Sequence, residues 1–189
     1  VRYGFWIAGL LIDLVTPMTT LSRQRRLPRL STSRLPERFG LFTIIVLGES
    51  IVGGVRGVAA TGLFTFPIAF KGALGIALAF ALWWVYFDFI ARRPARAGVW
   101  WTLSWGYLHL PLVMAITAVG AGVLNAVAFE DAVLPGNQRL LLAGAVAAAL
   151  ITIAAIELTV RPDHVAAERL RWSAPLKLFT GFLAAGVAV

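Results

Sequence analysis

The sequence contains no cysteine, only two histidines and little charge of either sign. Without cysteine, the chain has no disulfide bonds, thiolate nucleophiles or thiolate metal ligands. Charged residues make up 14% of the chain and hydrophobic residues 59%, and the mean hydropathy is +0.82. Soluble domains carry about 25% charged residues, and disordered chains are more polar still. The composition therefore excludes a disordered chain and argues against a soluble single domain.

Recognised enzyme motifs are also missing. The chain has no HExxH, GxSxG, P-loop or GxGxxG sequence, which are the signatures of zinc proteases, serine hydrolases and nucleotide-binding sites. His109 lies in an apolar run and His164 in a loop, so the two histidines are weak candidates for a shared metal site. We therefore expect no catalytic residues, no metal site and no cofactor, and we predict that the protein is not an enzyme.

Long apolar segments recur along the chain. They cover about residues 3–16, 37–59, 67–90, 100–123, 138–160 and 172–189. Each of the four complete segments extends roughly 33 Å as a helix, enough to cross a hydrocarbon core of about 30 Å. Because strict alternation is missing, helices are favoured over barrel strands. We predict an all-α fold, a polytopic transmembrane helical bundle that forms one domain over residues 1–189. Its first and last segments are truncated, which indicates a fragment of a longer chain.

Basic residues gather in alternate connections. Twelve of the 17 Lys and Arg residues lie in or beside the loops 17–36, 92–99 and 161–171, whereas the loops 61–66 and 129–137 have none. The positive-inside rule predicts that the three arginine-rich loops are cytoplasmic. The net charge of +8 therefore predicts topology rather than nucleic-acid binding.

The first arginine-rich stretch, residues 23–38, also suits contact with anionic lipid headgroups. Its basic residues are Arg23, Arg25, Arg26, Arg29, Arg34 and Arg38. Aromatic residues gather where apolar segments meet the cytoplasmic loops, which is typical of an interfacial belt. The belt predicted from this pattern comprises Trp83, Trp84, Tyr86, Phe87 and Phe89 near the end of one segment, and Trp100, Trp101, Trp105 and Tyr107 at the start of the next.

Ionisable residues within apolar segments are candidates for function, because each costs about 2.5–3.5 kcal/mol to place in lipid on insertion scales. The candidate residues are Asp13, Glu49, Arg56, Asp88, His109 and Glu157. By helical rise, Glu49 lies about 16–18 Å from the cytoplasmic end of its segment, and His109 about 13 Å. Asp13, Asp88 and Glu157 lie only about one turn from their cytoplasmic ends. These three carboxylates either reach water or a loop arginine, or line the inner mouth of a polar path.

Glu49 is the deepest of the candidate carboxylates, and it needs a partner, a proton or water. Arg56 follows seven residues later on the same helical face, about 10 Å closer to the outer surface. Gly53 and Gly57 form a small-xxx-small pair that allows another helix to approach closely, so we expect Glu49 in a packed bundle interior. Two roles remain open for Glu49: a structural bond to a neighbouring helix, or transport and proton relay. For His109, the alternatives are an interhelical hydrogen bond and a hydrated spot beside Pro111.

Three sequence pieces carry a resemblance to a known family. ERFGLFTIIVLGES at residues 37–50 is followed by LWWVYFD at 82–88 and HLPLV at 109–113. In this order they resemble the bacterial low temperature requirement A family. The positions that match the motifs are Glu37, Arg38, Gly48, Glu49, Tyr86, Asp88 and His109.

The resemblance implies a polytopic inner-membrane protein linked to growth at low temperature, without assigning a biochemical activity. Members of the family are about twice as long and begin with a segment like ELFFDLVFV. This chain would therefore be the C-terminal portion, and the missing N-terminal half would be among its partners, together with the lipid bilayer.

Two functional hypotheses follow. The first is a transporter or channel-like protein for a solute or ion, with Glu49 as the mid-membrane polar element and Arg56 as its charge partner or outer gate. Asp88, His109, Asp13 and Glu157 would then line an inner polar path. The acidic set favours a cation or a proton. The alternative is a membrane scaffold or sensor that acts through helix packing and through lipid or protein partners. The sequence does not predict the oligomeric state.

Overall fold

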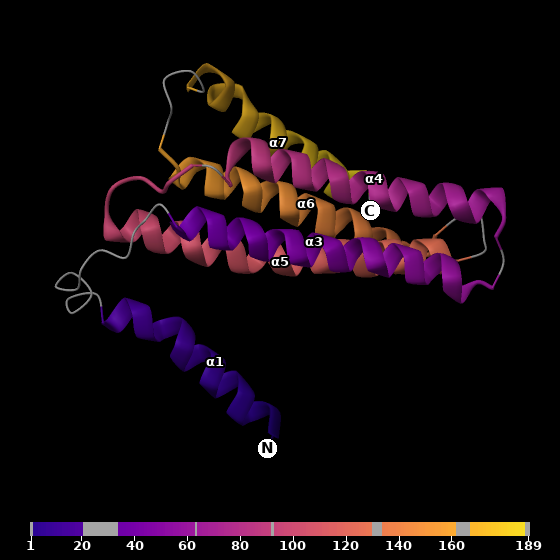
Figure 1. Cartoon of the computed structure of the whole chain (residues 1–189), viewed down its shortest axis with the longest axis horizontal. Helices are drawn as coiled ribbons and strands as arrows, with labels where there is room; N and C mark the ends of the chain where they lie inside the picture. Colours follow the sequence, from indigo (N-terminus) through magenta and orange to yellow (C-terminus); the bar gives the residue numbers. More distant parts are fainter. Residues whose placement is uncertain are drawn as a thin grey trace. The chain divides into compact units, whose positions relative to one another are not determined.

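The computed structural model describes residues 2–20, 34–62, 64–91, 93–129, 134–161 and 167–187. Arg23, Arg25, Arg26 and Arg29, and with them most of the predicted lipid-contact stretch, lie outside the described residues. The regular elements of the described residues are helices (Figure 1), as the apolar segments predicted. They are α1 (Arg2–Thr19), α3 (Arg34–Ala60), α4 (Phe66–Phe89), α5 (Val99–Ala128), α6 (Gly136–Thr159) and α7 (Ala167–Val187).

Four helices, α3 to α6, are long and apolar enough to cross a membrane. At 1.5 Å per residue, even the 24 residues of α4 and of α6 span about 36 Å. Each predicted segment overlaps one observed helix. The largest extensions beyond the predicted bounds are in α5, which continues from Val123 to Ala128, and in α7, which begins at Ala167 instead of residue 172. The added turn of α7 contains Glu168, Arg169 and Arg171, charged residues that form helix readily but lack the hydrophobicity by which the segments were recognised.

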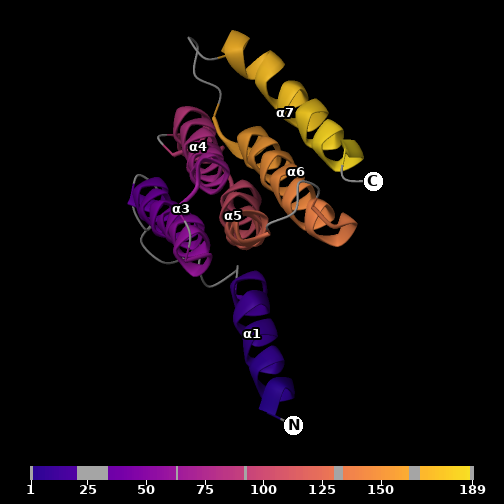
Figure 2. The same cartoon turned by 90° about the vertical axis from the view of Figure 1, so that its right-hand side faces the viewer.

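Residues 1–32 and 33–189 form two compact units. The first contains α1, whose apolar side chains are largely exposed. In the second, α5 packs against both α3 and α6, and α7 packs against α6. Figure 2 shows this order, with α5 between α3 and α6 and with α7 beyond α6. Helix α4 contacts α3, α5 and α6. The core is centred on α5, from which Leu112, Ile116 and Val119 are buried.

The close approach of α3 and α5 depends on small residues. An added Cβ at Gly53 would lie 3.5 Å from the carbonyl oxygen of Gly120, and one at Gly57 would lie 3.2 Å from that of Leu124. Ser50 occupies the tightest point, because a Cβ on Gly120 would come within 2.8 Å of its Cα. The close approach predicted for the Gly53 and Gly57 pair is therefore present, and α5 is the helix that uses it.

Two arginine-rich connections meet at one end of the bundle. The backbone amide of Arg96 donates to the carbonyl oxygen of Thr159 at 2.9 Å, and that of Arg161 donates to Pro94 at 3.0 Å. Ala95 and Val160 form an isolated antiparallel bridge between the same segments. Residues 94–96 after α4 and residues 159–161 at the end of α6 are thus joined, so these parts of the two connections lie on the same side of the bundle, as the alternation of charge predicted.

Candidate functional site

The candidate residues differ in whether their side chains are exposed or buried in the bundle. Asp13 lies on α1, in the first unit, and is exposed. Asp88 is exposed at the end of α4, whereas His109 and Glu157 are each 1% exposed. The structure therefore brings two of the six candidates into the bundle interior, and both belong to the end of the bundle that carries the joined arginine-rich loops.

Glu49 and Arg56 lie on the outward face of α3. Their side chains are 68% and 71% exposed, and Arg56 Nη1 lies 3.8 Å from Glu49 Oε1. The seven-residue spacing predicted this shared face. The packed surroundings expected for Glu49 are not found among the described residues, because one residue of helix corresponds to a rotation of about 100°. Ser50 points into the α3–α5 contact, where its hydroxyl donates to the carbonyl of Ile116 at 3.0 Å, and Glu49 points away from it.

His109 is enclosed by three helices. Its Nδ1 lies 2.7 Å from the carbonyl oxygen of Trp105, one turn earlier in α5. A carbonyl only accepts, so Nδ1 carries the hydrogen, and in the neutral ring Nε2 accepts from the hydroxyl of Tyr86 at 3.0 Å. The rings of Trp105 and Phe39 lie 4.3 and 4.6 Å from the imidazole. The sequence left two alternatives open for His109, and the structure shows the interhelical hydrogen bond, with Tyr86 as the partner.

The aromatic residues near this end belong to two populations. Trp84 and Trp100 are exposed, as expected for an interfacial belt, whereas Tyr86 and Trp105 are buried. Their burial departs from the predicted belt because Tyr86 faces His109 across the α4–α5 contact and Trp105 packs on His109 from one turn earlier in α5. Arg96 lies over the ring of Trp101 at 5.1 Å from the centroid, which holds this part of the belt against the end of the bundle.

Glu157 forms the most completely bonded polar cluster among the described residues. Lys177 Nζ donates to Glu157 Oε2 and to Ser173 Oγ, each at 2.6 Å, and the Ser173 hydroxyl donates to Glu157 Oε1. The Lys177 ammonium also lies 3.4 Å from the centroid of the Phe89 ring. We call Glu157, Ser173 and Lys177 the α6–α7 triad. Its three members are buried, with Ser173 9% and Lys177 7% exposed.

The sequence identified Glu157, with two alternatives for its surroundings: water or a loop arginine, or the inner mouth of a polar path. Ser173 and Lys177 were not predicted. A signal for them was present: Lys177 is an ionisable residue inside the last apolar segment, and Ser173 is four residues earlier. That spacing places both side chains on one face of a helix. The contact with Glu157 could not be predicted, because the sequence does not show how α6 and α7 are oriented relative to each other.

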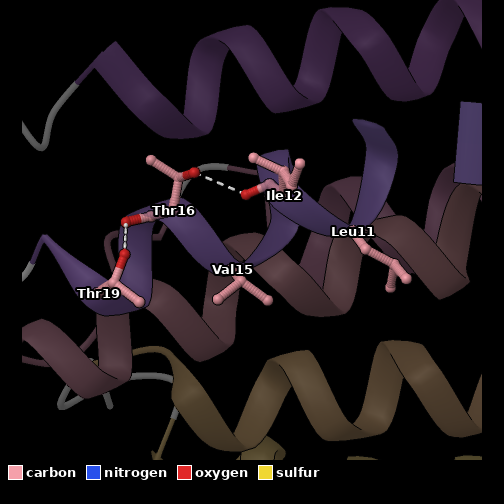
Figure 3. Close-up of a pocket in the computed structure, with 5 residues that line it drawn as sticks. All are labelled: Leu11, Ile12, Val15, Thr16 and Thr19. Carbon is pink, nitrogen blue, oxygen red and sulfur yellow. Dashed lines mark hydrogen bonds between the residues drawn. The ribbon is translucent and has the colours of Figure 1, made fainter. Parts of the chain in front are cut away.

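The polar groups of α1 do not form a comparable site. Figure 3 shows a shallow pocket lined by Leu11, Ile12, Val15, Thr16 and Thr19, all from α1. The hydroxyl of Thr16 donates to the carbonyl of Ile12 at 2.6 Å, and that of Thr19 donates to Thr16 at 3.0 Å. These hydroxyls are satisfied within their own helix, so the pocket presents an apolar surface. Across the described residues, no group of three or more His, Cys, Asp or Glu is placed to hold a metal ion.

Comparison with known proteins places the chain by its sequence. The family model described as Bacterial low temperature requirement A protein (LtrA) matches residues 1–189, the whole chain. No curated protein and no solved structure matches. The resemblance carried by the three motifs is therefore confirmed. Of the motif positions, Tyr86 and His109 are bonded to each other in the bundle interior, whereas Glu37, Arg38, Glu49 and Asp88 are exposed.

Proposed function

The chain belongs to the bacterial low temperature requirement A family, and we propose that it moves a cation or a proton across the bacterial inner membrane. It has helices that can cross a membrane, so lipid surrounds it. The observation that carries the proposal is the α6–α7 triad, in which a carboxylate and an ammonium group lie inside an apolar bundle. Charged groups at such positions are expensive, and in membrane proteins they mark ion paths and proton relays.

The position of the triad supports an inner polar path. Glu157 lies two residues before the end of α6, and His109 and Tyr86 lie at the same end of the bundle. Asp88, near the end of α4, acts electrostatically on Lys177. A path that enters at the arginine-rich end would meet these groups first. In this proposal the loops 17–36, 92–99 and 161–171 are cytoplasmic, because their arginines resist translocation.

The proposed activity involves no covalent chemistry, in line with the missing enzyme motifs. Glu49 and Arg56 do not belong to the groups of the proposed inner path. As an exposed pair near mid-membrane, they would contribute to an ion path only where a further protein surface or water meets the outward face of α3. The proposal therefore assigns the inner path to the groups near the arginine-rich end and leaves the α3 pair to a separate test.

A scaffold function is the second candidate, and it is favoured by a different observation. Both oxygens of Glu157 accept a hydrogen bond, and the α3–α5 contact is tightly packed at Gly120 and Ser50. Polar groups that are fully paired between helices can serve as packing contacts alone, worth about 0.6 kcal/mol each on average. Under this alternative the polar clusters hold helices together and no ion moves.

Ion movement in liposomes separates the two candidates. The full-length protein is reconstituted, and initial rates are measured for gradients of protons, sodium and potassium against protein-free liposomes. We expect one of these cations to move faster with protein, and Glu157→Gln to reduce that rate while Glu37→Gln, an exposed residue in the first turn of α3, does not. Rates equal to those of protein-free liposomes for every ion would favour the scaffold.

A further inference from the structure

The α6–α7 triad already contains a cation of its own. The ammonium of Lys177 contacts an oxygen of Glu157, the oxygen of Ser173 and the face of Phe89. These three contacts account for the three N–H donors of an ammonium group. We propose that Lys177 takes the place that a metal cation would have at Glu157, so that the ion handled at this site is the proton. This inference rests on the proposed function and names its ion.

The chemistry of the triad disfavours a metal ion. Calcium needs six to eight oxygen ligands and magnesium needs near-octahedral coordination. The triad offers the two oxygens of Glu157 and the hydroxyl of Ser173, and Lys177 contacts two of these three atoms at 2.6 Å. A metal ion would have to displace a covalently tethered ammonium group and would lie against its positive charge. A proton requires neither additional ligands nor additional space.

Charge balance explains how a proton could open and reset the triad. With Glu157 ionised and Lys177 protonated, the triad is neutral, which is the state that a buried pair tolerates. Uptake of a second proton forms an O–H bond on Glu157 and leaves a buried ammonium without a counter-ion. That imbalance favours separation of the pair or release of a proton from Lys177.

The cycle closes without any other reactant. Loss of the Lys177 proton breaks one N–H bond and leaves a neutral amine beside a neutral carboxylic acid. Ser173 contacts both groups, so it can accept the Glu157 proton while its own hydroxyl proton passes to the amine. The O–H bond breaks, an N–H bond forms and the original ion pair returns. If uptake and release occur on opposite sides, one proton has crossed the site.

Two charged groups from neighbouring elements act on this exchange. Asp88 of α4 and Arg93 of the following loop both contribute to the electrostatic environment of Lys177. Their charges are opposite in sign, so they act on the ammonium group in opposite directions. The ring of Phe89 holds the ammonium without adding a second carboxylate, so Glu157 remains the acidic partner within contact distance.

The variant Lys177→Arg distinguishes between two roles of Lys177, proton carrier and member of a structural ion pair. Lys177→Arg keeps a positive charge that pairs with carboxylates and stacks on aromatic rings, but a guanidinium does not release its proton in proteins. A structural pair would tolerate this change, whereas a proton carrier would not. The matched control is Lys71→Arg, because Lys71 is the other lysine of the chain and donates to the carbonyl of Phe129 at 2.7 Å.

The test uses the full-length protein in phosphatidylethanolamine–phosphatidylglycerol liposomes with a trapped pH dye and a clamped membrane potential. We expect proton entry driven by a pH gradient to fall about tenfold or more in Lys177→Arg and Glu157→Gln, as for loss of a proton-transfer group, and Lys71→Arg to stay within about twofold of wild type. If Lys177→Arg does not give a folded, monodisperse protein, Ser173→Ala keeps the ion pair and should slow proton entry by removing the hydroxyl between its members.

The outcomes distinguish this inference from the proposed function. Wild-type protein that moves sodium or potassium but no protons would overturn the inference and leave ion transport standing. Proton entry at the wild-type rate in Lys177→Arg would likewise overturn it. No movement of any of the three ions by the wild type would overturn both proposals. Proton entry that depends on Lys177 and Glu157, and not on Lys71, supports both.

Discussion

At the scale of single residues, direction on the helix matters as much as depth. Glu49 and Glu157 both lie in helices that can cross a membrane, yet Glu157 is buried against two donors of α7 and Glu49 is exposed beside Arg56. A carboxylate that faces the bundle can be satisfied by its own fold. One that faces outward in a membrane requires another source of compensation.

The first prediction concerns the α3 pair. Glu49→Gln or Arg56→Gln alone leaves one charge without its partner, and a charge at the centre of a helix costs about 2.5–3.5 kcal/mol in membrane insertion. We expect each single variant to lower the yield of membrane-inserted protein, and the double variant to recover toward wild type. Fractionation of cells that express each variant measures this yield. Single variants with wild-type yield would show that the outward face of α3 does not meet a low-dielectric environment.

The second prediction concerns the bond between Tyr86 and His109. Tyr86→Phe removes the hydroxyl 3.0 Å from His109 Nε2 and leaves a buried nitrogen without a donor, which costs about 1–3 kcal/mol. Thermal unfolding in detergent, followed by circular dichroism, should show a lower midpoint. In a His109→Leu background the same change should cost much less, because the bond is already absent. Equal losses in the two backgrounds would mean that the contribution of the hydroxyl does not depend on His109.

At the scale of helices, the sequence predicted where each helix lies along the chain better than it predicted which helix faces contact each other. Apolar length and arginine-rich connections were sufficient to predict six helical segments. Helices α4 and α5 are apolar nearly all round, so no polar stripe marks the face that is buried. For this reason the burial of Tyr86 and Trp105 was missed. The pairing of Glu157 with Lys177 was missed because the sequence does not show how α6 and α7 are oriented by their connection. Where a local pattern did define a face, at Gly53 and Gly57, the predicted close approach is present.

The third prediction tests the α3–α5 contact. Gly120→Ala would place a Cβ 2.8 Å from the backbone of Ser50, and such overpacking costs about 1–3 kcal/mol. Gly48→Ala in α3 is the matched control, because nothing lies within 4 Å of its added Cβ. Alanine is the better helix former by up to about 1 kcal/mol, so Gly48→Ala should unfold at the same temperature or a higher one. A Gly120→Ala protein as stable as wild type would contradict this contact.

At the scale of the whole molecule, the buried polar clusters lie at the end of the bundle where the segment after α4 meets the end of α6. The bonds between Arg96, Thr159, Pro94 and Arg161 join these two segments directly. Under the proposed topology this end faces the cytoplasm, where water and protons meet the entrance to the α6–α7 triad. The function proposed for the chain therefore depends on its orientation in a membrane.

Cysteine accessibility tests this orientation most directly, because residues 1–189 contain no cysteine and any cysteine elsewhere in the full-length protein is first replaced by serine. Three single substitutions in the full-length protein are sufficient: Ala97→Cys beside the arginine-rich loop, Thr65→Cys at the opposite end of α4, and Ile45→Cys on the outward face of α3. We expect a membrane-impermeant maleimide to label position 65 in intact cells, and position 97 only after the membrane is opened. Ile45, although 68% exposed on the protein surface, should resist labelling in both conditions because lipid or protein covers it. Labelling of position 97 from outside, or of position 45 by the aqueous reagent, would contradict the account.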